Sequence, residues 1–333
     1  MSYLYINENG AVIGIEENKV VVHSQDGMKR SVPIETLESI TIMGTSQMTT
    51  QCTVECLKKG IPVSYFSKGG SYFGRLQSTG HINPVRQRKQ SYLGDTEFSI
   101  EFSKKIIRAK IQNQLVVMKR YAKSKNIDIA EEEKYMKIAL EKINGCNTIS
   151  EIMGYEGTAA KYYFKALSKS IEKEFQFAGR SRRPPMDPYN SLISLGYSIV
   201  MNEIYGIIEQ KGLNPYFGFL HSDREKHPTL ASDLIEEWRA VIVDATAMSV
   251  LNGHEMTTDH FMEGLDAPGC FLTKEGLKVY LKKLEKKLQT DIRYLDYVEY
   301  PVSFRRAMDL QVGCLVKAIE TEDASLYTPI RIR

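Results

Sequence analysis

A lone histidine stands ahead of two carboxylates that share one face of a predicted helix. His221 follows the apolar run of residues 218–220, and Asp233 and Glu236 lie at i and i+3 further along the chain. Residues three apart on an α-helix project from the same side. An imidazole beside two carboxylates, joined by one more acid, suits a divalent ion such as Mg²⁺ or Mn²⁺. The residue types and their spacing therefore predict a metal site.

Glu156 offers the further acid. It stands between Gly154 and Gly157, immediately before the helical run TAAKYYFKAL. Because glycine readily adopts turn conformations, we expect a turn that orients the Glu156 side chain, followed by a helix from residue 158 to about 177.

A second predicted helix carries Asp233 and Glu236. Pro228 and Thr229 mark its start, and the helical pattern continues to Gly253. Its apolar positions recur at helical spacing: Leu230, Leu234, Ile235, Trp238 and Val241.

Each of these residues also has an ordinary structural interpretation. Histidine is common in half-buried positions without any ligand. Asp233 and Glu236 could form a solvated face, since Glu237 and Arg239 make the same helix charged elsewhere. From the residues alone, a structural histidine beside a surface acid pair stays open.

Three stretches, in this order and at this separation, resemble the CRISPR-associated protein one family, the integrase subunit of spacer acquisition in CRISPR antiviral defence. They are GYEGTAAKYYF, RRPPMDPYNSLISLGYSIV and GFLHSDREKHPTLASDLIEEWR. The resemblance runs along nearly the whole chain. It implies that Glu156, His221 and Glu236 hold the metal, and that Asp233 is an additional catalytic acid beside it. Some relatives carry Asp where this chain has Glu236, which leaves the reach of that ligand open but not its charge.

Any nucleic-acid site must come from local clustering, because 44 basic residues against 41 acidic ones leave a net charge of only +3. Arg182 and Arg183 lie in a proline-stiffened loop that can present guanidinium groups to phosphates. We assign DNA contacts to this pair, to Lys226 and Arg239, and, through the resemblance, to Asn190. Basic residues on solvated surface are the alternative for each.

The overall pattern predicts an α+β protein: a small β-rich domain followed by a larger, mainly α-helical one. Short alternating segments separated by Asn-Gly and Asp-Gly turns fill residues 1–80. Residues 81–96 are expected to be a linker, and residues 97–333 a helical catalytic domain. The resemblance makes residues 1–80 a dimerisation domain. The final residues, TPIRIR, are expected to form a tail that is disordered or docks on a partner.

Targeting and redox signals are few. No apolar run looks long enough to cross a bilayer, and the start MSYLYINENG lacks the features of a signal peptide, so we expect a cytoplasmic protein without membrane contact. Five cysteines without a CxxC pair argue against a disulfide framework, and Cys52 and Cys56 are expected to be small apolar helix residues.

With the resemblance, the expected function is a metal-dependent DNA integrase and endonuclease of CRISPR adaptation. A donor 3′-OH would attack a repeat phosphodiester by transesterification, with Mg²⁺ or Mn²⁺ as cofactor. The implied partners are donor and repeat DNA, a second copy in a homodimer, and a dimer of CRISPR-associated protein two. Two alternatives remain: a plain metal-dependent nuclease on branched or single-stranded nucleic acid, and a non-enzymatic DNA-binding scaffold.

Overall fold

The computed structural model describes residues 2–264, 268–295 and 297–332. The chain divides into two compact units, residues 1–82 and residues 83–333. The first is rich in strands and the second is mainly helical, which confirms the predicted α+β class. Within the segment expected to be a linker, Pro84–Leu93 forms helix α2, which belongs to the second unit.

The first unit contains two four-stranded sheets. One has the order β1-β5-β7-β8, in which β8 is antiparallel to β7 and the other neighbours are parallel. The other has the order β4-β3-β2-β6, an antiparallel meander with β6 parallel to β2. The strands are β1 Ser2–Ile6, β2 Val12–Glu16, β3 Lys19–His23, β4 Lys29–Pro33, β5 Leu37–Met43, β6 Gln47–Met48, β7 Val63–Phe66 and β8 Tyr72–Leu76.

Helix α1 (Thr50–Lys58) completes the core of this unit. The Thr49 side chain caps it by accepting a hydrogen bond from the Cys52 amide. Cys52 and Cys56 are free thiols, fully buried in the same cluster as Ile13 and Ile40. They therefore serve as small apolar core residues, as their i, i+4 spacing predicts.

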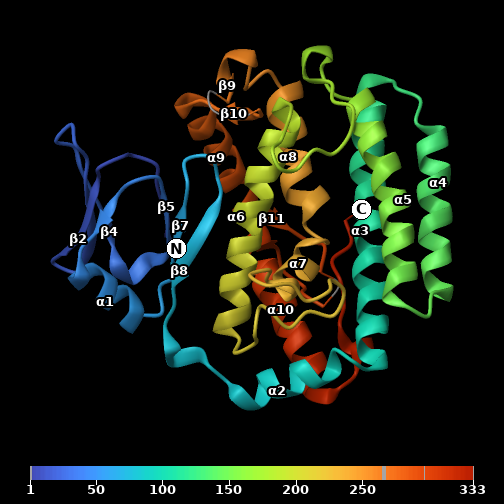
Figure 1. Cartoon of the computed structure of the whole chain (residues 1–333), viewed down its shortest axis with the longest axis horizontal. Helices are drawn as coiled ribbons and strands as arrows, with labels where there is room; N and C mark the ends of the chain where they lie inside the picture. The colour runs from blue at the N-terminus through green and yellow to red at the C-terminus, as the bar shows by residue number, and fades with distance from the viewer. Residues whose placement is uncertain (1, 265–267, 296, 333) are drawn as a thin grey trace. The chain divides into compact units, whose positions relative to one another are not determined.

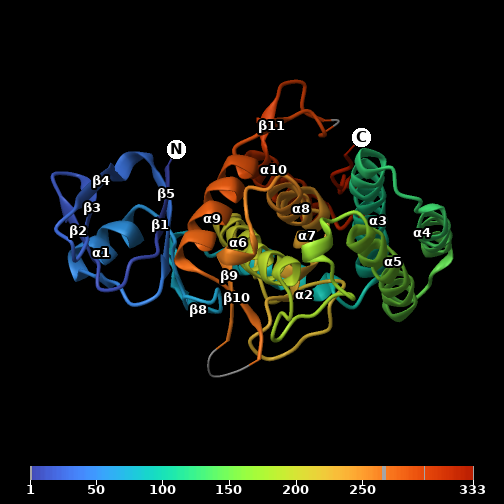
Figure 2. The same ribbon diagram turned by 90° about the horizontal axis from the view of Figure 1, so that it is seen from above.

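The second unit is built from helices, of which α3, α5 and α4 lie side by side (Figures 1 and 2). The apolar helix α6 packs against α7, α8 and α10. The helices are α3 Glu97–Lys125, α4 Ala130–Lys142, α5 Ile149–Lys169, α6 Pro188–Gln210, α7 Thr229–Ile235, α8 Ala245–Asn252, α9 Lys274–Leu288 and α10 Phe304–Thr321. Two short ribbons accompany them: β9 Phe261–Glu263 with β10 Cys270–Leu272, and β11 Asp291–Ile292 with β12 Val302–Ser303.

The turn predicted around Glu156 is wrong, because Glu156 lies inside helix α5. A capping box between Thr148 and Glu151 starts this helix before the glycines, and they do not interrupt it. A glycine in a helix interior costs about 0.5–1 kcal/mol relative to alanine, which the packing of α5 against α3 and α4 outweighs. The orientation of Glu156 therefore comes from a helix face. The helix ends at Lys169, earlier than expected.

The long regular helix predicted from Thr229 to Gly253 is also interrupted. Helix α7 ends at Ile235, a π-helical segment spans Arg239–Asp244, and α8 follows. A π-segment widens the helix by one residue per turn and often occurs at functional sites. Here it comes directly after Glu236, and apolar periodicity does not distinguish it from ordinary helix.

One expectation about membranes needs correction. Among the described residues, helix α6 is long and apolar enough to span a bilayer by length and composition, with a mean hydropathy of 1.3. However, 67% of that apolar window is buried within the protein. The helix is apolar because neighbouring helices surround it in the core.

Residues 327–332 dock on their own chain, whereas the final residues were expected to be disordered or to dock on a partner. Arg333 lies outside the described residues. Tyr327 and Ile330 are fully buried. The Tyr327 hydroxyl donates to Glu237 Oε1 at 2.5 Å, and the Ile330 amide donates to Glu237 Oε2 at 2.7 Å. Asn113 of α3 donates to the Ile330 carbonyl at 3.2 Å. The buried apolar side chains of Tyr327, Ile330 and Ile332 explain this docking.

Glu237 should make stability depend on pH. Burial raises its pKa to about 8, against the opposing effect of its hydrogen-bond donors. The folded state thus holds a proton that the unfolded chain releases above about pH 4.5, so stability present at low pH is lost as the pH rises toward 8. Between pH 6 and 8 the loss should be about 2 kcal/mol. Urea unfolding at pH 6 and pH 8 should show this fall in the free energy of unfolding for the wild type. The fall should be much smaller for Glu237→Gln, whose amide resembles the protonated acid. An equal fall in both proteins would contradict the role of Glu237.

Candidate active site

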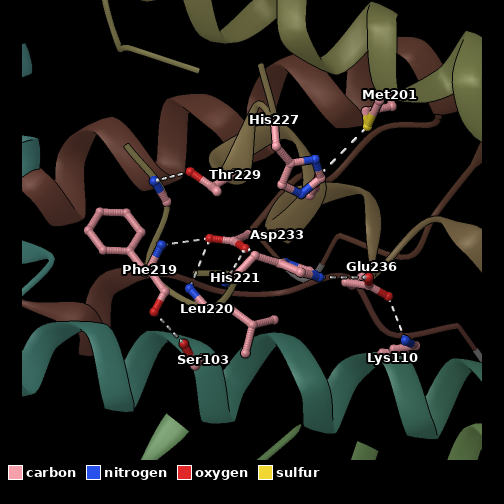
Figure 3. Close-up of polar contacts among 12 residues, drawn as sticks. Ser103, Lys110, Met201, Phe219, Leu220, His221, His227, Thr229, Asp233 and Glu236 are labelled. Carbon is pink, nitrogen blue, oxygen red and sulfur yellow. Dashed lines mark hydrogen bonds and ion pairs between the residues drawn. The ribbon is translucent and has the colours of Figure 1, made fainter. Parts of the chain in front are cut away.

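Side chains from three helices and one loop meet at a single point of the helical unit. Lys110 of α3 contacts Glu156 of α5, and its Nζ lies 2.6 Å from Oε2 of Glu236, the residue that follows α7. On the other side of Glu236, His221 Nε2 lies 3.8 Å from Oε1 (Figure 3). The Glu156, Glu236 and Lys110 side chains are 16%, 6% and 8% exposed. This is a largely buried charged cluster, and it brings together the three residues predicted to bind metal.

Asp233 fixes the loop that carries His221. Its carboxylate is fully buried and accepts hydrogen bonds from the backbone amides of Phe219, Leu220 and His221 at 2.6, 3.0 and 3.0 Å. The fourth contact is His221 Nδ1, 2.7 Å from Asp233 Oδ1 (Figure 3). A carboxylate only accepts, so Nδ1 carries the hydrogen. In the neutral imidazole this leaves the Nε2 lone pair directed toward Glu236.

Gly218 allows the loop to close around Asp233. A Cβ at position 218 would lie 2.7 Å from Asp233 Oδ2 and 2.8 Å from the Thr229 backbone, so a side chain there would clash. Phe219 and Leu220 are buried, at 5% and 3% exposure. His221 therefore emerges where the chain leaves the interior, as the apolar run before it predicts.

The charges in this cluster shift one another's pKa values. Burial alone would lower the pKa of His221, but the hydrogen bond and charge of Asp233 outweigh it and raise the pKa above its usual value. Burial alone would raise the pKa of Glu236, but Arg239 and Lys110 hold it well below its usual range. Glu236 is therefore ionised at neutral pH and available as an anionic ligand.

The donor set fits a hard divalent ion, although the side chains as arranged do not form a cage. In the described part of the chain, no three His, Cys, Asp or Glu residues stand in a metal-holding arrangement. The Lys110 ammonium occupies the space between Glu156 and Glu236. Oε2 of Glu236 is buried and makes no aligned hydrogen bond, although two cations lie nearby. A free imidazole nitrogen and carboxylate oxygens are ligands suited to Mg²⁺ or Mn²⁺.

Arg239 belongs to this cluster. Its Nε lies 3.1 Å from Glu236 Oε2, and its guanidinium lies 4.5 Å from the centre of the Tyr197 ring. The Tyr197 hydroxyl donates to the buried Asp244, which also accepts a hydrogen bond from Tyr163 at 2.9 Å. The π-helical segment thus connects the site to α5 and α6 through one polar network.

Three of the residues predicted to contact DNA are exposed. Arg182 and Arg183 lie in the loop before α6, and Lys226 lies in the loop between His221 and α7. None of the three makes a hydrogen bond or ion pair within the described chain. Their charges are therefore free for an external anion.

Asn190 has a different role from the one predicted. It is fully buried. Its side-chain amide donates to the Gly179 carbonyl and to Asp187, and its oxygen accepts from Arg180 and the Ser181 amide, all at 2.7–3.1 Å. With every polar position occupied, Asn190 has no group left for DNA. It instead fixes the base of the loop that carries Arg182 and Arg183.

Lys110 is the site residue that the sequence interpretation missed. No role was assigned to it from the sequence. Lys110, however, lies three residues after Ile107 and one before Ile111, on the buried side of α3. A lysine within an apolar stripe is the signal that could have identified it, because an unpaired buried ammonium is costly.

The fold and the site together define a two-unit α+β protein in which helices and one loop bring an imidazole, two glutamates and a lysine to one largely buried point. The chain belongs to the CRISPR associated protein Cas1 family, whose model matches residues 4–286. The family predicted from the three motifs is thereby confirmed.

Relatives extend over the whole chain. A protein of Mycobacterium tuberculosis (strain CDC 1551 / Oshkosh), named CRISPR-associated endonuclease Cas1, is 35% identical over all of this chain and 98% of its own length. Among solved structures, a casposase bound to integration product has a TM-score of 0.86 at 21% identity, covering 98% of this chain and 93% of that one. A chain of a Cas6-RT-Cas1–Cas2 complex has the same TM-score at 24% identity, covering all of this chain and 36% of that one. At these identities the two structures show a shared fold.

Proposed function

We propose that this protein is a metal-dependent DNA endonuclease and integrase of CRISPR adaptation, which joins the 3′-OH of a donor strand to a repeat phosphodiester by transesterification. One observation carries the proposal: Glu156, His221 and Glu236 meet in one largely buried cluster, with the His221 tautomer fixed by Asp233. The name of the M. tuberculosis relative and the fold shared with a casposase bound to integration product support it.

The residues have separate roles in this chemistry. Glu156, Glu236 and His221 Nε2 would hold Mg²⁺ or Mn²⁺, while Asp233 accepts a hydrogen bond from Nδ1 and so orients the imidazole. The bound ion would supply polarisation of the phosphodiester and a lower pKa for the attacking hydroxyl. Arg239, fixed between Glu236 and Tyr197, places a positive charge where a phosphate oxygen could bind. Burial of the cluster strengthens each of these interactions.

A strand-transfer assay tests this function and separates it from the two alternatives. Labelled 3′-OH donor DNA is incubated with a repeat-containing duplex, the protein and a Cas2 dimer, with and without Mg²⁺ or Mn²⁺. We expect joined product only with metal and a free 3′-OH. Cut DNA that forms equally with a 3′-blocked donor would favour a plain nuclease, and binding without any product would favour a scaffold.

Replacing Arg182 and Arg183 by alanine should weaken DNA binding without changing sequence preference. Both side chains are exposed and unpaired among the described residues, and phosphate contacts release counterions without reading bases. Filter binding over a range of salt should show a salt slope shallower by about 2. Lys278→Ala with Lys282→Ala removes the same charge from the exposed face of α9 and should leave the slope unchanged. An unaltered slope in the arginine variant would make its loop ordinary surface.

We propose that the protein acts as a homodimer through its first unit, in the cytoplasm, together with a Cas2 dimer. The first unit ends its sheets in edge strands, which commonly pair with other chains, and a Cas1–Cas2 complex contains the shared fold. Light scattering of the full chain at micromolar concentration should give twice the monomer mass. Deleting residues 1–82 should give a monomer, and a monomeric full-length chain would exclude the dimer.

A further inference from the structure

Lys110 has an unusual position for a lysine, because its ammonium lies between the two glutamates proposed as metal ligands. It contacts Glu156 and lies 2.6 Å from Glu236 Oε2, while its side chain is only 8% exposed. Both carboxylates are within ion-pair distance of this ammonium, and such partners are what a buried cation requires. A full positive charge is thus already present at the centre of the cluster.

The ammonium and a metal ion cannot share this place. Oxygen ligands of Mg²⁺ lie about 2.0–2.1 Å from the ion, and two adjacent ligands are then about 3 Å apart. His221 Nε2 and Glu236 Oε1, 3.8 Å apart, need only a small approach to reach that separation. Glu156, in contrast, reaches Glu236 only through the Lys110 ammonium, which lies between the two carboxylates. A divalent ion bound to all three residues would therefore have to displace Lys110.

Charge balance explains why a cation is needed before the metal arrives. Lys110 contacts both Glu156 and Glu236, whereas Arg239 contacts only Glu236 among these two. Without Lys110, Glu156 would face Glu236 across a buried space with no cation beside it in the described part of the chain, which is strongly unfavourable. Lysine suits this role better than arginine, since its compact charge on a flexible four-carbon stem can move aside.

We propose that Lys110 is the placeholder cation of the metal site: it holds Glu156 and Glu236 together in the metal-free protein and is displaced from between them by the incoming divalent ion. This positioning role rests on the proposed metal-dependent function. It implies that Lys110 competes with the metal, so its presence weakens metal binding while it stabilises the metal-free fold. A lysine that only supported the site's architecture would do the opposite, and its removal would weaken metal binding.

The test measures Mn²⁺ binding by calorimetry and melting temperature with and without metal, for the wild type and Lys110→Gln. We expect Lys110→Gln to bind Mn²⁺ on the order of tenfold more tightly, to melt at a lower temperature without metal, and to gain more from saturating Mn²⁺ than the wild type does. Lys110→Arg keeps the charge and should not bind more tightly than wild type. Lys104→Gln removes a charge of the same helix that is paired with Glu101, and should leave Mn²⁺ affinity unchanged.

The outcomes separate this proposal from the one on which it rests. If the wild type binds Mn²⁺ and Lys110→Gln binds it equally or more weakly, the placeholder role is overturned while the metal site stands. If neither protein binds Mn²⁺, both proposals fall. If Lys110→Gln does not fold without metal, the wild-type protein alone can test the proposal by NMR. The Lys110 ¹⁵Nζ resonance, identified by its absence from the spectrum of Lys110→Arg, should shift when Mg²⁺ binds. A resonance that does not move overturns the proposal.

Discussion

His221→Ala should lower strand transfer by about three orders of magnitude while leaving the fold intact. The imidazole is 24% exposed and lies at the edge of the cluster, so its removal leaves no large cavity. What is lost is the Nε2 lone pair, the neutral nitrogen ligand beside Glu236. The measurement is integration of a 3′-OH donor into a repeat-containing duplex, together with thermal melting and filter binding of the same protein preparations.

His227→Ala is the matched control. His227 lies in the same loop, with its ring centre 6.1 Å from that of His221, and it interacts with Ser232 rather than with the carboxylates. We expect His227→Ala to retain near wild-type integration. Near wild-type integration by His221→Ala would end the metal-site interpretation, together with the assignment of Glu156 and Glu236 as its companions.

Acid pH should imitate the loss of His221. Asp233 and Glu236 raise the pKa of the imidazole, so the proton competes with the metal for Nε2 at a higher pH than for an ordinary histidine. Raising Mn²⁺ should therefore partly restore the wild-type rate at low pH. The same increase should not restore His221→Ala, which has no nitrogen left to bind the ion.

Asp233→Asn should affect both activity and stability. An amide at this position would present an N–H₂ group to backbone amides that need an acceptor, and each buried donor left unpaired costs about 1–3 kcal/mol. We expect the free energy of unfolding to fall by about 3 kcal/mol. Integration should fall by about tenfold to a hundredfold, because the His221 ring loses the partner that fixes its tautomer.

Asp223→Asn is the matched control for Asp233→Asn. Comparing the two variants by urea unfolding and Mn²⁺ binding separates the contribution of the hydrogen bonds from that of the charge. Asp223 is an exposed acid of the same loop, so its substitution removes an equal charge without unpairing any backbone amide. Asp223→Asn should match the wild type in stability. If Asp233→Asn matched it as well, the four hydrogen bonds to Asp233 would not be what holds the His221 loop.

By itself, the sequence determined the class of fold, the family and the three proposed metal-binding residues. Strand alternation and turn residues are local signals, so the β-rich first unit and the helical second unit follow from short stretches of chain. The i, i+3 spacing of Asp233 and Glu236 likewise places both carboxylates on one side. The order of three motifs was enough to identify the Cas1 family and to select Glu156 as the distant acid.

Tertiary structure decided how these groups interact. Glu156 is oriented by packing inside α5, although its two glycines indicated a turn. The C-terminal residues are buried by partners far away in sequence, such as Asn113 for Ile330. Asn190 is held by the folded loop just before it, through Gly179. Lys110 reaches Glu156 across 46 positions of the chain. Contacts of this kind depend on which helix faces meet, and local residue patterns do not specify that.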